Sequence, residues 1–454
     1  MQITITTKIP KDGVYISFSK NTETTQISLD SKNPVIILGI KEVTKFTLPL
    51  IVRKIARSAK GTDAKVFYVD IKDWLPLCEK ITNEDFFVEQ FAYEIGNASY
   101  DFEKYKKNVK KQTLNIISHT KKQSDLLTRG LLIAEELNIA RELVNTPGTH
   151  LTPDDLAKHA VSFAKGVKGL KVSVLDSKKM KALKMNAILA VGESSPNKPK
   201  FIVMEYEGAK KADKPIVFVG KGVTFDTGGS NLKPGDHMNG MHMDMAGGAI
   251  AIHTLLTLAK LKVKKNIVAL IPTVENRVTG DSYLPGDVIV GMSGKPIEVL
   301  NTDAEGRVIL SDALTYAKKY NPEVVVDLAT LTGAAVVALG SRVSAVFSND
   351  DALSQKLKII GEETKNLMWP MPLYDEYKED IKGDLGGVTN AHNKFKRDGG
   401  AITGAIFLAH FVDGYKWAHI DIAPRMESIS GDNLAIGATG EPLYALVSFV
   451  ENPR

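Results

Sequence analysis

The sequence of 454 residues contains a single cysteine, Cys78, so an intramolecular disulfide cannot form. A disulfide framework is therefore excluded, and we expect a reducing compartment. Cys78 stands near Trp74 and Leu77, which is typical of a packed core thiol rather than a nucleophile. No apolar run approaches the ~20 residues that a membrane span needs. The first residues, MQITITTKIP, alternate like a strand and lack the features of a signal peptide. These absences predict a cytoplasmic protein with no membrane partner.

A strong excess of charge is also missing. The formal net charge is only +5, which is too weak and dispersed to predict nucleic-acid binding. A DNA-binding or regulatory role stays open as an alternative, because it would need a basic groove that composition alone does not reveal. Hydrophobic residues make up 43% and charged residues 24%, as expected for a globular protein with a large core. The length suggests two or three domains.

The nucleotide-binding motifs are incomplete. A Gly-Lys-Gly sequence occurs at residues 220–222, but a Walker A loop needs glycine where Pro215 stands and Ser or Thr where Gly222 stands. A dinucleotide fingerprint would need a third glycine in place of Phe225. Nucleotide binding is therefore not favoured.

A histidine-based zinc motif is missing as well. The sequence has no HExxH motif, and the spacing of five between His237 and His242 does not put two imidazoles on one helix face. A cluster of methionines surrounds these histidines and favours core packing, with Met241 as the candidate for a substrate-pocket wall.

The pattern that is present is an alternation of strands and helices along the whole chain. It predicts an α/β fold with a smaller N-terminal α/β domain over residues 1–123, a linker helix over 124–146 and a larger domain over 147–454, which contains all the candidate catalytic residues described below. In the larger domain, near-continuous apolar strands alternate with helices, which predicts a mixed, largely parallel sheet flanked by helices. The expected strands are 215–220, 266–272, 323–329 and 417–423, and the expected helices are 246–260, 306–320 and 400–412.

Charged residues gather where these predicted strands end. They are Lys221, Asp226, Lys233, Asp244, Asp303, Glu305 and Arg307. Taken singly, each acid could be a turn former, a helix cap or a partner of a helix dipole. Ligands of such sheets sit beyond the carboxyl ends of the strands, so we expect these loops to meet at one edge. Four converging carboxylates would repel one another, and two divalent metal ions would remove that repulsion.

A pair of metal ions in turn predicts hydrolytic chemistry. The pair lowers the pKa of a bridging water toward neutrality and polarises a substrate carbonyl. Lys233 could stabilise the developing oxyanion, and Arg307 could hold an anion such as carboxylate or bicarbonate. If Asp303 and Glu305 lie in an extended segment, their side chains point to the same side. A phosphoesterase remains an alternative, although such sites more often include histidine.

Several segments then resemble one known family. NTDAEGR at residues 301–307 resembles the signature of the leucyl aminopeptidase family of two-metal exopeptidases. Other segments match family sequences in the same order, over roughly residues 130–440: ARELVNTPGTHLTP (140–153), VGKGVTFDTGG (219–229), DLATLTGA (327–334) and GGAITGAIFL (399–408). The resemblance implies an aminopeptidase that removes Leu and other mainly apolar N-terminal residues from peptides. It also implies attack by a metal-bridging hydroxide on the scissile carbonyl.

The resemblance also implies roles for individual residues. The implied metal ligands are Lys221, Asp226, Asp244, Asp303 and Glu305, with Asp226 and Glu305 as bridges. The implied catalytic residues are Lys233, which polarises the carbonyl, and Arg307, which holds a bicarbonate. The implied substrate-binding residues are Met241, Asn301, Thr330, Leu331 and Gly333. The implied cofactors are two divalent metal ions, Mn or Zn, with Mg or Co as alternatives, and the implied assembly is a homohexamer.

Some positions depart from the family pattern. Ser230-Asn231 replaces the commoner Ile-Ser, His242 stands where Lys or Arg is usual, and Ala246 replaces a glycine. Pro424 stands where glycine is usual. None of these is an implied ligand, but the changes at Ala246 and Pro424 leave the pocket shape, and hence the side-chain preference, open.

Overall fold

The structure, a computed structural model, describes all residues except 11, 23, 30–31, 386, 395–397 and 452–454. The chain forms two compact units. Unit 1 comprises Met1–Ile139, Glu362–Lys365 and Glu427–Gly437, and unit 2 comprises Ala140–Gly361, Asn366–Met426 and Ala438–Arg454. The long helix predicted near residue 124 is α4 (Lys121–Asn145). The domain boundaries at residues 123 and 146 stay a prediction.

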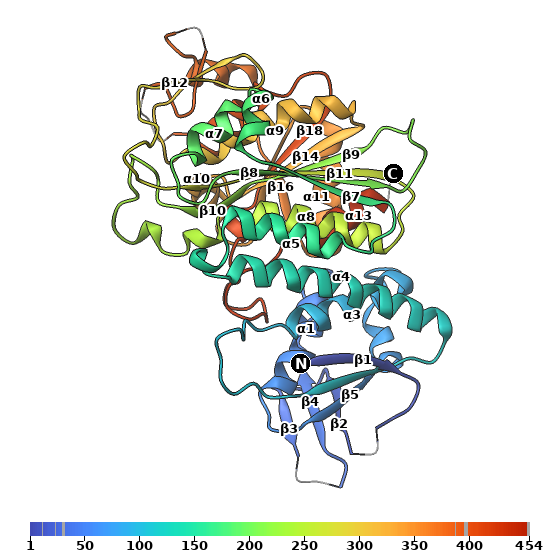
Figure 1. The fold of residues 1–454 in the computed structure, drawn as a ribbon. Coiled ribbons are helices and arrows are strands. Elements are labelled where there is room, and N and C mark those ends of the chain that lie inside the picture. Colours follow the sequence, from blue (N-terminus) through green and yellow to red (C-terminus); the bar gives the residue numbers. More distant parts are fainter. Residues whose placement is uncertain (11, 23, 30–31, 386, 395–397, 452–454) are drawn as a thin grey trace. The chain divides into compact units, whose positions relative to one another are not determined.

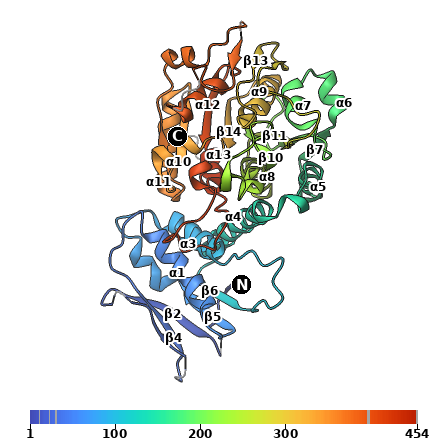
Figure 2. The same cartoon turned by 90° about the vertical axis from the view of Figure 1, so that its left-hand side faces the viewer.

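The described part of unit 1 forms a six-stranded sheet in the order β1-β6-β5-β2-β4-β3. All neighbouring strands are parallel except β3 and β4. The strands are β1 (Gln2–Thr6), β2 (Val14–Ser19), β3 (Gln26–Ser28), β4 (Val35–Gly39), β5 (Val66–Asp70) and β6 (Thr113–Ile117), and the helices are α1 (Leu48–Lys60), α2 (Ile71–Trp74) and α3 (Glu84–Ala98). Figure 2 shows α1 and α3 packed together beside this sheet.

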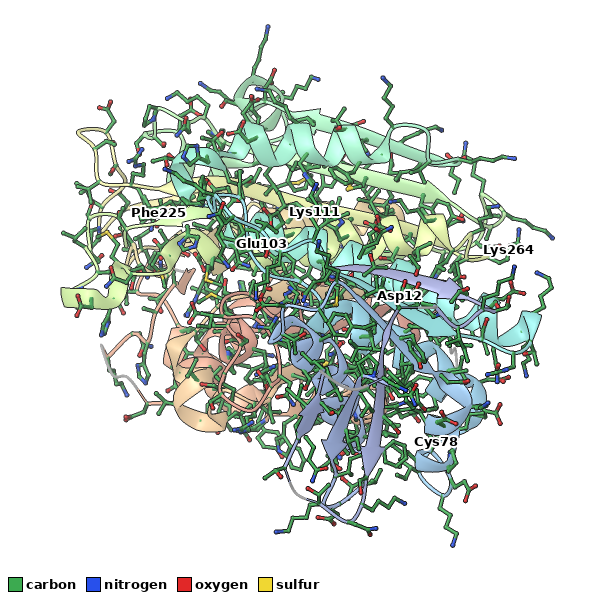
Figure 3. The ribbon with its side chains drawn as sticks, turned by 90° about the horizontal axis from the view of Figure 1, so that it is seen from below. Asp12, Cys78, Glu103, Lys111, Phe225 and Lys264 are labelled. Atoms are coloured by element: carbon green, nitrogen blue, oxygen red, sulfur yellow. The ribbon has the colours of Figure 1, made fainter. Side chains whose placement is uncertain are left out.

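The core of unit 1 follows from the sequence pattern. Ile51, Ile55 and Ala59 recur four residues apart along α1, and all three are buried. Cys78, which is labelled in Figure 3, is also buried in this unit. Its thiol donates a hydrogen bond to the carbonyl of Leu75 at 3.0 Å. The prediction of a packed core thiol is therefore confirmed.

The described part of unit 2 contains a nine-stranded sheet in the order β16-β15-β18-β14-β9-β11-β8-β7, with β10 paired to β11. Its strands are β7 (Leu170–Leu175), β8 (Lys200–Glu207), β9 (Ile216–Gly220), β10 (Gly222–Asp226), β11 (Asn266–Asn276), β14 (Val324–Ala329), β15 (Ser344–Ser348), β16 (Met368–Pro370) and β18 (Lys416–Asp421). The pairs β7–β8, β8–β11 and β15–β18 are antiparallel and the others are parallel. The predicted mixed, largely parallel sheet is confirmed.

The remaining elements of unit 2 are helices and a small sheet. The helices are α5 (Pro153–Ala164), α6 (Ser177–Ala182), α7 (Asn186–Gly192), α8 (Ala246–Lys260), α9 (Glu305–Ala317), α10 (Gly333–Leu339), α11 (Asp351–Thr364), α12 (Gly400–Ala409) and α13 (Leu443–Glu451). The small sheet has the order β12 (Val288–Val290), β13 (Pro296–Glu298) and β17 (Val388–Thr389). Among the described residues, no helix is long and apolar enough to cross a membrane.

Helices cover both faces of the large sheet. Figure 1 shows α5 and α8 on one face and α7 and α9 on the other. All residues of β9 and β14 are consequently buried, as expected for strands in a sheet that is covered on both sides. Helix α8 has the predicted bounds, whereas α9 and α12 end three residues earlier than predicted.

Strand β11 is longer than predicted and changes partners at Pro272. The predicted strand ended at this residue, and proline lacks the N–H that a central strand normally donates. In the structure, β9 pairs with β11 only as far as Leu270, and β10 begins its pairing at Thr273. Pro272 therefore lies in the gap between two parallel partners. The strand continues to Asn276 and carries that residue to the same sheet edge as Asp226.

Candidate active site

Lys221 connects β9 to β10 and is held there by its own backbone. Its N–H donates to the carbonyl of Leu328 at 2.9 Å, and its carbonyl accepts from the N–H of Gly248 at 2.7 Å. The side chain is only 4% exposed, and its Nζ lies 2.8 Å from both Asp244 Oδ1 and Glu305 Oε1. The ammonium therefore bridges two carboxylates that come from separate loops.

Gly306 makes room for this lysine. A Cβ atom at position 306 would lie 2.6 Å from Lys221 Cε and 2.7 Å from its Nζ. Any larger residue at this position in α9 would displace the amine. The glycine of the NTDAEGR segment thus has a steric role that its place in the sequence did not reveal.

Lys233 bridges a second pair of carboxylates. Its Nζ lies 2.7 Å from Asp226 Oδ2 and 2.6 Å from Asp303 Oδ1. We call these two acids the Asp226–Asp303 pair, and the two that flank Lys221 the Asp244–Glu305 pair. Each pair of acids is therefore held together by one lysine.

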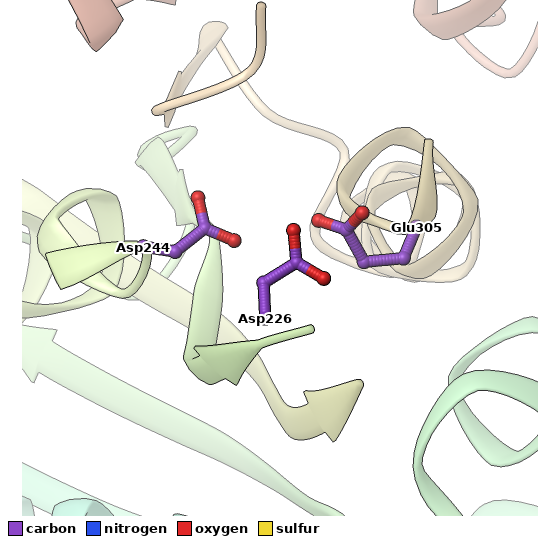
Figure 4. A group of neighbouring side chains, drawn as sticks. All are labelled: Asp226, Asp244 and Glu305. Carbon is purple, nitrogen blue, oxygen red and sulfur yellow. The ribbon is translucent and has the colours of Figure 1, made fainter. Parts of the chain in front are cut away.

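The two pairs form one cluster. One carboxylate oxygen from each of Asp226, Asp244 and Glu305 lies within 4.8 Å of the others, and all three residues are buried. Figure 4 shows these carboxylates directed toward one another from the end of β10, the approach to α8 and the start of α9. The prediction that loops from distant parts of the sequence meet at one edge of the sheet is confirmed.

The charges in the cluster shift one another's pKa values. Burial lowers the pKa of Lys221, but Asp244 and Glu305 raise it more, so the net pKa lies above the ordinary value. Burial likewise lowers the pKa of Lys233, and the charges of Asp226 and Glu305 reverse that effect. Burial raises the pKa of Asp244 well above its usual value, although Lys221 opposes the shift. Both lysines therefore act as counterions to the acids.

The donor set fits divalent metal ions. Asp244 Oδ2 is buried and has no hydrogen-bond partner among the residues that the structure describes. Burial and the charge of Glu305 raise the pKa of Asp303, even though Lys233 opposes this. Four acids share only two lysines, so negative charge remains in excess. Carboxylate oxygens are the ligands that hard divalent cations prefer.

One geometric assumption about this site was wrong. Asp303 and Glu305 do not lie in an extended segment, because residues 302–303 form a turn and Glu305 begins helix α9. The two side chains reach the cluster by different routes. Asp303 meets Lys233, whereas Glu305 meets Lys221.

Arg307 lies beside a cavity next to the cluster. The cavity has a volume of about 790 Å³, and its wall includes Asp303, Asn301, Leu331 and Gly333. Arg307 is buried and donates from Nη1 to a backbone carbonyl at 2.9 Å. Burial lowers the pKa of Arg307 to about 10, although nearby carboxylates oppose the shift. The cavity brings the candidate anion-holding arginine together with three of the predicted substrate-binding residues.

The other two predicted substrate-binding residues lie elsewhere. Neither Met241 nor Thr330 is among the residues lining this cavity. The hydroxyl of Thr330 donates to Asp244 Oδ1 at 2.7 Å, and its carbonyl accepts from Lys221 Nζ at 3.1 Å. Thr330 thus contacts both members of the Lys221–Asp244 ion pair.

Sequence reasoning missed several neutral residues that support the cluster. Asn276 Nδ2 donates to Asp226 Oδ1 at 2.7 Å. Asn390 accepts at Oδ1 from the N–H groups of Leu300 and Asn301, just before the NTDAEGR turn. Asn231 Oδ1 accepts from the N–H of Thr302 at 2.8 Å, and its signal in the sequence was its departure from the family pattern. No comparable signal existed for Asn276 or Asn390, because their roles depend on which strand ends lie side by side.

Comparison with known proteins agrees with this geometry. The model of the cytosol aminopeptidase family, catalytic domain, matches residues 138–447. A probable cytosol aminopeptidase of Aromatoleum aromaticum is 44% identical over 376 residues, which cover 81% of this chain and 74% of the relative. A probable cytosol aminopeptidase of Nitrosococcus oceani is 42% identical over 366 residues, which cover 80% and 72%. The solved bottromycin maturation enzyme BotP in complex with Mn has a TM-score of 0.86 at 27% identity, covering 97% of this chain and 99% of that chain.

The fold and these matches define a metal-dependent aminopeptidase. The chain belongs to the cytosol aminopeptidase family. The family implies divalent metal ions and peptide substrates, and the buried carboxylate cluster is consistent with such ions.

Proposed function

We propose that the protein removes Leu and other mainly apolar residues from the free N-terminus of peptides at the lysine-bridged carboxylate cluster. The observation that carries this proposal is the pairing of four acids with two lysines at one sheet edge. The cavity beside Arg307 supports an apolar preference, because much of its wall is apolar, including Leu331, Val337 and Ile402.

The ligand set that we propose is Lys221, Asp226, Asp244, Asp303 and Glu305. Lys221 would bind as a neutral amine, because two adjacent divalent ions would lower its pKa and displace its proton. When bound, two divalent metal ions supply Lewis acidity and a water of lowered pKa. Mn or Zn is our choice of ion, with Mg or Co as alternatives, because oxygen and amine donors suit them all. The similarity to a structure solved with Mn makes Mn the first ion to test.

The remaining charged residues have separate roles in this proposal. Lys233 directs its ammonium into the cluster and would stabilise negative charge as it develops on the scissile carbonyl oxygen. Arg307 would hold a bicarbonate that accepts a proton from the attacking water. We also propose that the chain acts as a cytoplasmic homohexamer.

The experiment that tests the function is hydrolysis of leucine p-nitroanilide by purified protein. We expect no activity after chelation, recovery when Mn²⁺ or Zn²⁺ is added back, and no reaction with N-acetylated leucine p-nitroanilide. Loss of activity on acetylation would show that a free α-amine is required. Absence of activity with every metal would contradict the proposal and bring the DNA-binding alternative forward, to be tested by a gel shift at several salt concentrations.

A further inference from the structure

Asp421 is a fully buried acid that ends β18 and lies outside the carboxylate cluster. Its Oδ1 accepts from the N–H groups of Leu331 and Ala423, both at 3.1 Å. Its Oδ2 accepts from the hydroxyl of Thr332 at 2.6 Å. Two of these three hydrogen bonds therefore hold the segment that follows β14.

The segment that Asp421 holds forms one wall of the cavity beside Arg307. Residues 331–334 all line that cavity, and we call them the wall segment. Thr332 also connects this segment to helix α10, because its hydroxyl oxygen accepts from the N–H of Ala335 at 3.1 Å. Asp421 thus fixes the wall segment between β14 and α10.

Helix α12 packs closely against the same segment. A Cβ atom at Gly404 of this helix would lie 3.1 Å from Leu331 Cδ2 and 3.2 Å from Thr332 Cγ2. The side chains of Leu331 and Thr332 therefore lie directly against the backbone of α12. The position of the wall depends on this contact and on the hydrogen bonds to Asp421.

The residue before the wall segment is held by different partners. The hydroxyl of Thr330 donates to Asp244, and its carbonyl accepts from Lys221. The bonds to Asp421 begin one residue later, at Leu331. Loss of these bonds should therefore loosen the wall and leave the carboxylate cluster in place.

We propose that Asp421 is a positioning residue for substrate specificity, because it fixes the wall segment against which the apolar side chain of the substrate binds. The inference rests on the proposed function, since it assumes that the cavity receives that side chain. Its physical reason is that a wall which must become ordered on binding holds a ligand less tightly than a wall that is already fixed. Asp421 would thus affect substrate binding rather than the chemical step.

The test is steady-state kinetics of Asp421→Asn with leucine p-nitroanilide and alanine p-nitroanilide at saturating Mn²⁺. Asparagine keeps the shape of the side chain, but either orientation of its amide turns an NH2 group toward a group that donates to Asp421. We expect KM for the leucine substrate to rise about tenfold while kcat stays within about threefold, because binding common to the ground state and the transition state is lost.

Two further quantities sharpen this test. KM for alanine p-nitroanilide should rise less than about threefold, because a methyl group contacts little of the wall. Bound Mn²⁺, measured by elemental analysis after dialysis, should equal that of wild type. Together these results would show that the wall has changed and the metal ligands have not.

Asp327→Asn is the matched control. Asp327 is a buried acid on the neighbouring strand β14, and its carboxylate lies 2.6 Å from both Trp417 Nε1 and His419 Nδ1 rather than next to the wall segment. This variant should lower the melting temperature but change KM for either substrate by less than about twofold. Loss of folded enzyme lowers the apparent kcat and leaves KM unchanged, so the two constants separate positioning from a merely structural role.

Several outcomes would overturn the inference. They are equal rises in KM for the two substrates, a fall in kcat with unchanged KM, and a rise in KM in Asp327→Asn as large as in Asp421→Asn. A wild-type protein that hydrolyses neither substrate with any divalent ion would overturn the proposed function and the inference together. An active wild type with an unchanged KM in Asp421→Asn would overturn the inference alone.

If Asp421→Asn does not fold, Thr332→Val replaces it, with Thr332→Ser as its matched control. Valine keeps the shape of the threonine side chain but removes the hydroxyl that donates to Asp421, whereas serine keeps that hydroxyl. Thr332→Val should raise KM for leucine p-nitroanilide about tenfold, and Thr332→Ser should stay within about threefold of wild type. An unchanged KM in Thr332→Val would contradict the inference.

Discussion

The two units contain sheets with parallel strands, yet their strand ends differ in charge balance. In unit 1, Asp70 ends β5, caps the next helix through the N–H of Lys72 and lies 2.6 Å from His119 Nε2. In unit 2, Asp226 ends β10 and shares Lys233 with a second acid. The acid of unit 1 is satisfied by local partners. The acids of unit 2 outnumber their lysines.

This difference shows why one sheet edge suits metal chemistry and the other does not. An isolated acid with a helix N–H and a histidine has little to gain from a divalent cation. Four buried acids with two lysines keep an excess of negative charge, which a cation would neutralise. The fold places the strand ends, and the side chains on them decide the chemistry.

The largest effect should come from replacing Asp226, with Asp70 of unit 1 as the matched control. Asp226→Asn removes one carboxylate from the cluster, so we expect kcat/KM for leucine p-nitroanilide to fall about 10³-fold or more with Mn²⁺ present. Asp70→Asn changes the same residue type at a strand end in unit 1 and should leave kcat/KM within about twofold. The assay is steady-state kinetics at saturating Mn²⁺. Similar losses in both variants would contradict the comparison.

A second test concerns the lysines that balance the acids. Lys233→Met keeps the length of the side chain but removes its charge, so kcat should fall about 10²- to 10³-fold. Metal binding should be retained or strengthened, because the acids lose a competing cation. Steady-state kinetics and elemental analysis of the dialysed variant measure the two quantities. A loss of bound metal in proportion to the loss of kcat would refute the assigned role.

The cavity offers a smaller effect. Gly333 lines it, and a Cβ there would meet no atom within 4 Å. Gly333→Leu should fold normally, project into the cavity and raise KM for leucine peptides about tenfold, with unchanged metal content. Gly280→Leu is the control, because that glycine is equally open and does not line the cavity. An unchanged KM would show that substrate does not use this cavity.

The smallest effect should come from Asp312, a buried acid of unit 2 outside the cluster. Its carboxylate accepts from the N–H groups of Ala187, Ile188 and Met292. Burial nevertheless raises the pKa of Asp312 to about 7. The folded protein therefore binds this proton more tightly than the unfolded chain, and the stabilisation is lost as the pH rises from about 4 to 7.

The Asp312→Asn variant tests this assignment. Asparagine cannot ionise, so only wild type should lose this contribution to stability as pH rises. The unfolding free energy of wild type minus that of the variant should therefore fall with rising pH, by at most about 1.4 kcal/mol per pH unit. Urea unfolding of the metal-free proteins between pH 4.5 and 7.5 measures the difference. A difference that stays constant across this range would contradict the assignment.

The regular parts of the fold were predictable because their patterns are local. The largely apolar strands β9 and β14 and the helix α8 follow directly from hydrophobic runs. The length of β11 was not predictable, because Pro272 is tolerated only where β9 and β10 succeed each other as partners. That arrangement depends on the whole sheet.

The charged residues of the site were predictable, but their support was not. Lys221 and Lys233 could be recognised by type and by resemblance to a known family. Thr302, by contrast, is a neutral residue at which three loops meet, and such a junction exists only in the folded chain. The steric role of Gly306 could not be predicted either, because it depends on the path of Lys221 across the start of α9.

Unit 1 is built from segments that lie far apart in the chain, and this has a consequence for biosynthesis. Arg53 Nη1 donates to the carbonyl of Asp432 at 3.1 Å, and Asn433 Nδ2 donates to the carbonyl of Leu50 at 2.9 Å. Residues near 430 leave the ribosome about 15 to 60 s after residue 139, at 5–20 residues per second. The N-terminal segment must therefore wait for its last hydrogen-bonding partners until the catalytic unit is almost fully synthesised.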